Sequence, residues 1–244
     1  MRAFVTQLRQ TIGWEPDAKD GPLPPLLVSL TLVTGLVDAF SYLVLGHVFV
    51  ANMTGNIVLL GFALVGAPGF SIVASLVAIG SFVLGGLAGG QIGAHFKSHR
   101  GQQLSKAASL QVVFLGAGAI LAAMSLDSMS EGYHYAMIAV LAIGMGIQNA
   151  TARKLAVPDL TTTVLTLTIT AVAADSALGG GTGSKAGRRL VAVATMLTGA
   201  VVGAALIVHH EHVYPLLTAV IVTLGVATTA AVLGRTNPDW VSAG

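Results

Sequence analysis

The stretch Val48-Phe-Val-Ala-Asn-Met-Thr-Gly-Asn56 decides the fold, because it places polar residues inside an apolar segment that runs from 48 to 65. A helix needs about 20 residues to cross a bilayer, so this segment is marginal in length as well as polar. Non-helical backbone is tolerated at membrane depth only where protein or water satisfies its polar groups. The stretch therefore predicts a segment that dips into the membrane, with Thr54 to Asn56 capping a half-helix.

The rest of the chain predicts a single all-α polytopic membrane domain. Of its 244 residues, 54% are hydrophobic and only 9% are charged, whereas soluble domains carry about 25% charged residues. The absence of cysteine excludes disulfides, thiolate metal sites and thiol nucleophiles. Eight apolar segments are expected, at residues 25–45, 48–65, 70–94, 107–126, 135–155, 160–174, 190–208 and 214–233.

Two of these segments are expected to be re-entrant. The sixth, which contains Thr161-Thr-Thr-Val-Leu-Thr-Leu-Thr-Ile-Thr170, is short and polar like the second. Basic clusters follow the third segment (Lys97, Arg100 and Lys106) and the sixth (Lys185, Arg188 and Arg189). Basic loops favour the cytoplasmic side, and both clusters lie there only if the odd segments return to the side they left. Six full spans are therefore predicted, with eight simple spans as the alternative.

The same charge argument predicts that both chain termini lie on the cytoplasmic side of the membrane. Residues 1–24 are predicted to form an amphipathic helix on the cytoplasmic membrane surface, because Phe4, Leu8 and Ile12 recur at helical spacing opposite Arg2 and Arg9. A frayed polar tail is the alternative for this segment.

A weak internal repeat links the two odd segments. Gly35-Leu-Val-Asp38-Ala39 matches Gly146-Ile-Gln-Asn149-Ala150 at a spacing of 111 residues, and residues 52–57 overlie residues 164–169 at one residue more. Three crossings per repeat would make the halves inverted, which is a recurring transporter design with broken helices near the midplane. The predicted units are an N-terminal segment at 1–24, a first membrane repeat at 25–126 and a second at 133–234.

These motifs resemble those of the YoaK-like family of small bacterial inner-membrane proteins, whose function is undefined. The resemblance runs from about residue 26 to residue 233, and it departs from the family pattern at Leu167, where a glycine is typical. It implies the fold and the location, but no substrate and no functional residues. Four motifs carry it: Gly35 to Leu43, Val48 to Asn56, Gly146 to Ala150 and Thr161 to Thr166.

Polar residues inside the apolar segments are the candidate site. Asp38 is the one carboxylate well inside a span, and such groups usually face a cavity or a partner. Half-helix N-termini near the midplane would favour an anion or a polar solute. Purely structural packing remains open for Asp38, and so do ordinary helix contacts for the threonines. The predicted substrate-binding residues are Asp38, Tyr42, Asn52, Thr54, Asn56, Gln148, Asn149, Thr163 and Thr166.

These residues predict a secondary transporter or channel for a small polar or anionic solute, with Asp38 as a possible coupling group. A non-transporting scaffold, assembly factor or sensor is the alternative. No enzyme, cofactor, metal site or nucleic-acid partner is expected; His209-His-Glu-His212 has ligand residue types without preorganised spacing. Gly85, Gly89 and Gly93 share one helix face, which predicts either close packing inside the chain or a homodimer seam.

Overall fold

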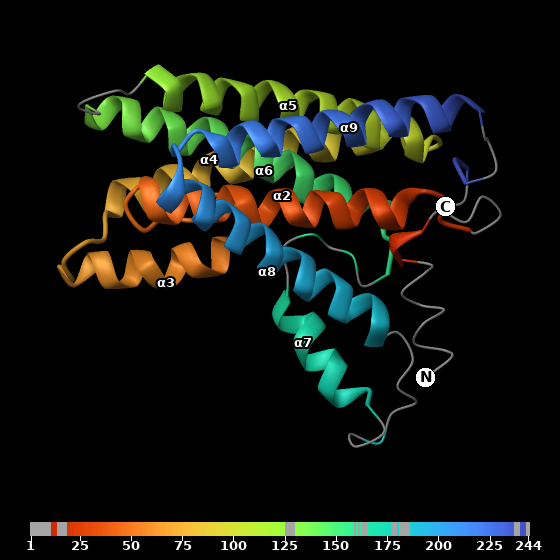
Figure 1. Cartoon of the computed structure of the whole chain (residues 1–244), viewed down its shortest axis with the longest axis horizontal. Helices are drawn as coiled ribbons and strands as arrows, with labels where there is room; N and C mark the ends of the chain where they lie inside the picture. Colours follow the sequence, from red (N-terminus) through yellow and green to blue (C-terminus); the bar gives the residue numbers. More distant parts are fainter. Residues whose placement is uncertain are drawn as a thin grey trace.

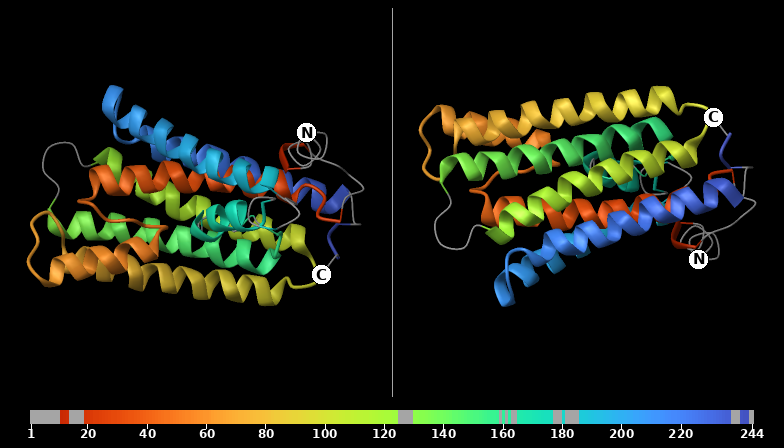
Figure 2. Two further views of the ribbon diagram at one scale, coloured as in Figure 1. Left: turned by 90° about the horizontal axis from the view of Figure 1, so that it is seen from below. Right: turned by 90° about the horizontal axis from the view of Figure 1, so that it is seen from above.

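The computed structural model describes residues 11–13, 19–124, 130–158, 160, 162, 165–176, 180, 186–236 and 240–242. Within these residues the chain forms helices and no strands (Figures 1 and 2). Most of the N-terminal segment 1–24 and Thr163 lie outside them. The helices are α2 (Leu23–Val44), α3 (Met53–Leu64), α4 (Ile72–His95), α5 (Arg100–Met124), α6 (Glu131–Leu155), α7 (Leu165–Ala174), α8 (Ala186–His209) and α9 (Tyr214–Thr236).

Six of these helices are long and apolar enough to cross a membrane, which confirms a polytopic all-α membrane protein. The six are α2, α4, α5, α6, α8 and α9. The predicted segments match them within a few residues, except that α5 begins at Arg100 rather than near residue 107. The polar residues 100–106 were read as a loop, but they continue the helix beyond its apolar part.

The two remaining helices, α3 and α7, are too short to cross. They contain 12 and 10 residues, which at about 1.5 Å per residue gives lengths of roughly 18 and 15 Å. The hydrocarbon core is about 30 Å thick, so neither helix is long enough to cross it, which favours six full spans over eight. Figure 1 shows both helices starting near the middle of the long axis and running toward opposite ends of the molecule.

One end of the bundle collects the basic side chains. Here α4, α6, α7 and α9 end and α5 and α8 begin (Figures 1 and 2). We refer to it as the basic end. It carries Lys97, Arg100, Lys106, Arg153, Lys154, Arg188, Arg189 and Arg235.

Glycine contacts hold the long helices together. A Cβ atom at Gly89 of α4 would lie 2.7 Å from the carbonyl oxygen of Ile147 in α6, and one at Gly85 would meet the carbonyl of Ile143. Such small residues let backbones approach where lipid gives no hydrophobic drive. The glycine face of α4 therefore packs inside the chain, and a homodimer seam at this face would have to displace α6.

Candidate functional site

Asp38 anchors the chain where it returns into the bundle after α2. Its Oδ1 atom accepts hydrogen bonds from the backbone N–H groups of Val50, at 3.2 Å, and Ala51, at 2.9 Å. The side chain is buried. Because residues 48–52 are not helical, these N–H groups have no helical partners, and the carboxylate supplies them with an acceptor inside the protein.

Asn56 fastens the same segment a second time. Its Oδ1 accepts from the backbone N–H of Phe49 at 2.9 Å, and its Nδ2 donates to the Phe49 carbonyl at 2.6 Å. Asn52 caps α3 by accepting from the N–H of Gly55 at 3.2 Å. The ring of Phe49 covers Gly55 so closely that a Cβ there would lie 2.8 Å from it, which explains the glycine in this motif. Tyr42 stacks on Phe49 with ring centroids 4.9 Å apart.

A cavity of about 520 Å³ lies where α3 and α7 begin. Volumes of this size are typical of small-molecule sites. Its polar wall is made of amides and hydroxyls from three helix regions: Asn52 and Thr54 at the start of α3, Asn149 in α6 and Thr166 in α7. The remaining lining residues are small or apolar, namely Ala51, Met53, Gly55, Val58, Phe82 and Met196.

The structure thus brings four of the predicted site residues to one cavity and places four others elsewhere. Asp38 and Asn56 hold the backbone around residues 49–51, and Tyr42 stacks behind Phe49. Gln148 belongs to a buried network, in which Gln111 donates to its Oε1 at 2.6 Å and its Nε2 donates to Thr34 at 2.8 Å. Whether the cavity binds a solute stays a prediction.

Sequence reasoning missed two large apolar side chains that other helices bring to the cavity, Phe82 of α4 and Met196 of α8. Each also lends its backbone carbonyl to a close glycine contact, Phe82 to Gly146 and Met196 to Gly35. The signal was present in the sequence, because the two residues stand 114 positions apart, close to the spacing of 111 between the two glycines. Extending the repeat into α4 and α8 would have found them.

No ionisable side chain lines this cavity within the part of the chain that the structure describes. Amides and hydroxyls both donate and accept hydrogen bonds, and Phe82 with the methionines offers a polarizable apolar face. The arrangement suits an uncharged solute that has polar groups on one side and an apolar surface on the other.

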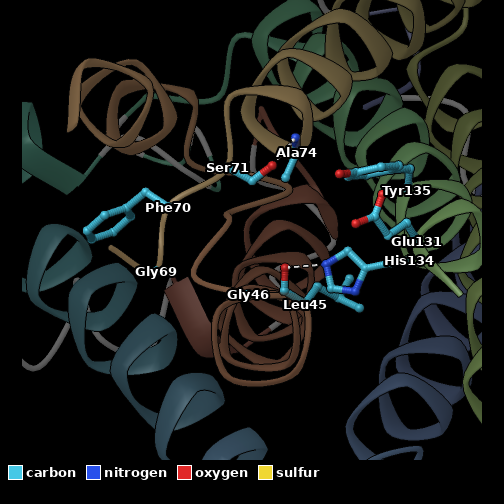
Figure 3. A pocket seen from close by; sticks show the side chains of 9 residues that line it. All are labelled: Leu45, Gly46, Gly69, Phe70, Ser71, Ala74, Glu131, His134 and Tyr135. Carbon is cyan, nitrogen blue, oxygen red and sulfur yellow. Dashed lines mark hydrogen bonds between the residues drawn. The ribbon is translucent and has the colours of Figure 1, made fainter. Parts of the chain in front are cut away.

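A second cavity, of about 340 Å³, lies at the end opposite the basic end (Figure 3). Glu131, His134 and Tyr135 reach into it from the first turns of α6, facing Ser71, which begins α4. Two of its polar groups already have structural partners. His134 donates from Nε2 to the Leu45 carbonyl at 2.8 Å, and Ser71 accepts from the N–H of Ala74 at 3.2 Å. These two side chains therefore already hold helix ends: His134 links α6 to the end of α2, and Ser71 caps α4.

Comparison with known proteins identifies the family. The family model described as "Protein of unknown function (DUF1275)" matches residues 26–229. The chain belongs to this family. It is also 36% identical, over 151 residues, to the UPF0700 transmembrane protein YoaK of Bacillus subtilis (strain 168), and the match covers 62% of this chain and 65% of that protein. The predicted YoaK-like membership is confirmed. No solved structure matches the chain.

Proposed function

We propose that the protein is a secondary carrier or channel for a small, uncharged polar solute, which binds in the cavity between the first turns of α3 and α7. One observation carries the proposal: polar residues at the tips of both half-helices line a single cavity. In transporters built this way, broken helices meet at the substrate site near the membrane midplane. The lack of a charged lining residue favours a neutral solute over the anion also expected from the sequence.

An inverted repeat is part of this proposal, and the glycine contacts support it. Gly35 packs on the carbonyl of Met196 as Gly146 packs on that of Phe82. In α4, Gly85 faces Ile143 and Gly89 faces Ile147. The equivalent glycines of α8, 114 positions later, are Gly199 and Gly203. They face Leu32 and Leu36 of α2, which stand 111 positions before Ile143 and Ile147.

The residues that line the cavity follow the same spacing between the two halves. Thr54 and Thr166 stand 112 positions apart and Phe82 and Met196 stand 114 apart, and both pairs line it. The packing of helix on helix is likewise matched between halves: α4 packs on α6 as α8 packs on α2, and α3 on α4 as α7 on α8. A site shared by two equivalent halves can open to either side with the same movement of each half.

We place the protein in a bacterial inner membrane with the basic end on the cytoplasmic side, because basic residues flanking spans favour that side. In this orientation α3 runs from the cavity toward the outside and α7 toward the cytoplasm. Asp38 acts on transport by holding the tip of α3 in place, since its Oδ1 accepts from the backbone N–H groups of residues 50 and 51. A coupling role for its charge remains part of the proposal that flux measurements must decide.

Solute-dependent stability tests the proposal. The purified protein is screened by thermal denaturation with uncharged polar solutes, small anions and cations, and a stabilising solute is then tested for flux in proteoliposomes. Thr54→Leu and Thr166→Leu should each abolish the stabilisation, and the double variant should add little because both residues serve one site. Thr170→Leu, an exposed threonine of α7 outside the cavity, is the matched control. A solute that stabilises the two single variants, the double variant and the control as strongly as the unaltered protein would overturn the proposed site.

A further inference from the structure

A third cavity, of about 300 Å³, lies at the basic end between α5 and α9. Its lining contains two cationic side chains, Lys106 of α5 and Arg235 of α9, together with the ring of His99 and the hydroxyl of Ser105. Among the residues that the structure describes, no acidic side chain lines it. Neither Lys106 nor Arg235 forms an ion pair with any residue that the structure describes.

The sequence places these groups together by helical spacing. His99, Gln102 and Lys106 recur at intervals of three and four residues, so they share one face at the start of α5. The opposing helix is kept close by Gly234, where a Cβ would lie 3.3 Å from the His99 ring. Ala230 and Ala231 leave the space beside it open, because their side chains are small.

The His99 ring is fixed as a hydrogen-bond donor toward this space. The backbone N–H of Gln102 donates to its Nδ1 at 3.1 Å, so Nδ1 is the acceptor and the ring proton of the neutral imidazole lies on Nε2. With the ammonium of Lys106, the guanidinium of Arg235 and the Ser105 hydroxyl, the cavity presents a set of donors that suits the oxygens of a phosphate group.

Apolar residues continue the same two helix faces into the membrane. Val113 follows Lys106 by seven residues in α5, and Leu224 precedes Ala231 by seven residues in α9, so each lies on the cavity side of its helix. Both side chains are exposed, at 63% and 49%. A headgroup phosphate in the cavity would therefore have its acyl chains beside an apolar track on the surface of the bundle.

From this geometry we propose that the cavity between α5 and α9 binds the phosphate of an anionic phospholipid headgroup. Basic pockets between membrane helices on the cytoplasmic side are a known way to recognise such headgroups. The site is separate from the cavity between α3 and α7 and shares no lining residue with it.

Lipid retention by the purified full-length protein tests this site. Native mass spectrometry and thermal denaturation are run with phosphatidylglycerol, with phosphatidylcholine of the same acyl chains, and with inorganic phosphate. Phosphatidylglycerol should be retained over phosphatidylcholine. The double variant K106Q/R235Q should weaken its binding by roughly thirtyfold, given the usual contribution of two basic residues at a membrane surface.

A control with the same loss of charge distinguishes a site from general attraction. Lys97 and Arg153 are exposed at the same end and do not line the cavity, so K97Q/R153Q should leave phosphatidylglycerol binding within a factor of about two. If inorganic phosphate alone stabilises the protein as well as the lipid does, the site takes the free ion and the lipid assignment is overturned. Equal losses in the two double variants, or equal retention of the two lipids, would also overturn it.

Discussion

The two re-entrant segments reach the same cavity but are held in different ways. The segment of α3 is fixed at its inner tip, where Asp38 and Asn56 bind the backbone of residues 49–51. The segment of α7 is fixed at its C-terminal end, away from the cavity, where Arg189 donates to the Ala171 carbonyl at 2.8 Å and to Asp175 at 2.6 Å.

The α3 segment also buries more of its side chains than the α7 segment does. Asn56, Leu59 and Ala63 of α3 are buried, whereas Thr168 is the one buried side chain among those described in α7. In the repeat that we propose, the glycine contacts are matched between the halves and the anchors are not. Close helix contacts depend on shape, so the glycines recur in both halves. The anchors differ in chemistry: the Asp38 carboxylate accepts from backbone N–H groups before α3, whereas the Arg189 guanidinium donates to a backbone carbonyl of α7.

The largest effect is expected from removing the inner anchor. Asp38→Ala leaves two buried backbone N–H groups without their acceptor, at about 1–3 kcal/mol each, so the free energy of unfolding should fall by several kcal/mol. Asp38→Asn keeps an acceptor oxygen, makes the position resemble Asn149, and should recover most of that loss. Denaturation in mild detergent measures both. Equal stability of the two variants would show that the bonds to residues 50 and 51 contribute nothing.

Glycine contacts should give the next largest effect, and a similar one in both halves. Gly85→Ala and Gly199→Ala each place a methyl group against a backbone carbonyl, which should cost about 1–3 kcal/mol as overpacking. Gly86→Ala is the matched control, because a Cβ there meets nothing within 4 Å, and alanine is the better helix former. Its stability should be unchanged or raised in the same denaturation assay. A loss in only one half would break the proposed equivalence.

The outer anchor of α7 should matter least. Arg189→Gln removes an ion pair whose carboxylate side chain is 53% exposed, and exposed pairs contribute about 1 kcal/mol or less. The loss should shrink as salt is added, because screening already weakens the pair. Thermal denaturation at two ionic strengths measures it. A large, salt-independent loss would mean that the guanidinium acts mainly through the Ala171 carbonyl.

The features of the fold that depend on neighbouring residues could be predicted from the sequence, whereas contacts between distant residues mostly could not. The spans and the two short segments follow from apolar length and from the basic clusters after residues 94 and 174. The pairing of Thr54 with Thr166 in one cavity was expected from the repeat. The anchoring role of Asp38 could not be predicted, because it depends on which N–H groups the folded chain presents 12 residues later.

The same limit applies to Gln148 and Arg100. Gln148 was predicted to bind substrate, yet it bonds Thr34 and Gln111 from two other helices. Arg100 was read as a loop charge, yet its guanidinium donates to Asp20 and to the Leu155 carbonyl, each at 3.0 Å. These partners are 37 or more positions away along the chain, and nothing in the local pattern points to them.

Cross-linking between the two half-helices tests the central claim most directly. The chain has no native cysteine, so Thr54→Cys with Thr166→Cys can be joined by a short bifunctional thiol reagent without background. The account predicts a rapid cross-link within one chain, slowed by a solute that stabilises the protein. Thr54→Cys with Leu167→Cys is the control, since Leu167 lies at the same depth but outside the cavity lining. Equal rates for the two pairs, or no cross-link within one chain, would contradict a cavity shared by both halves.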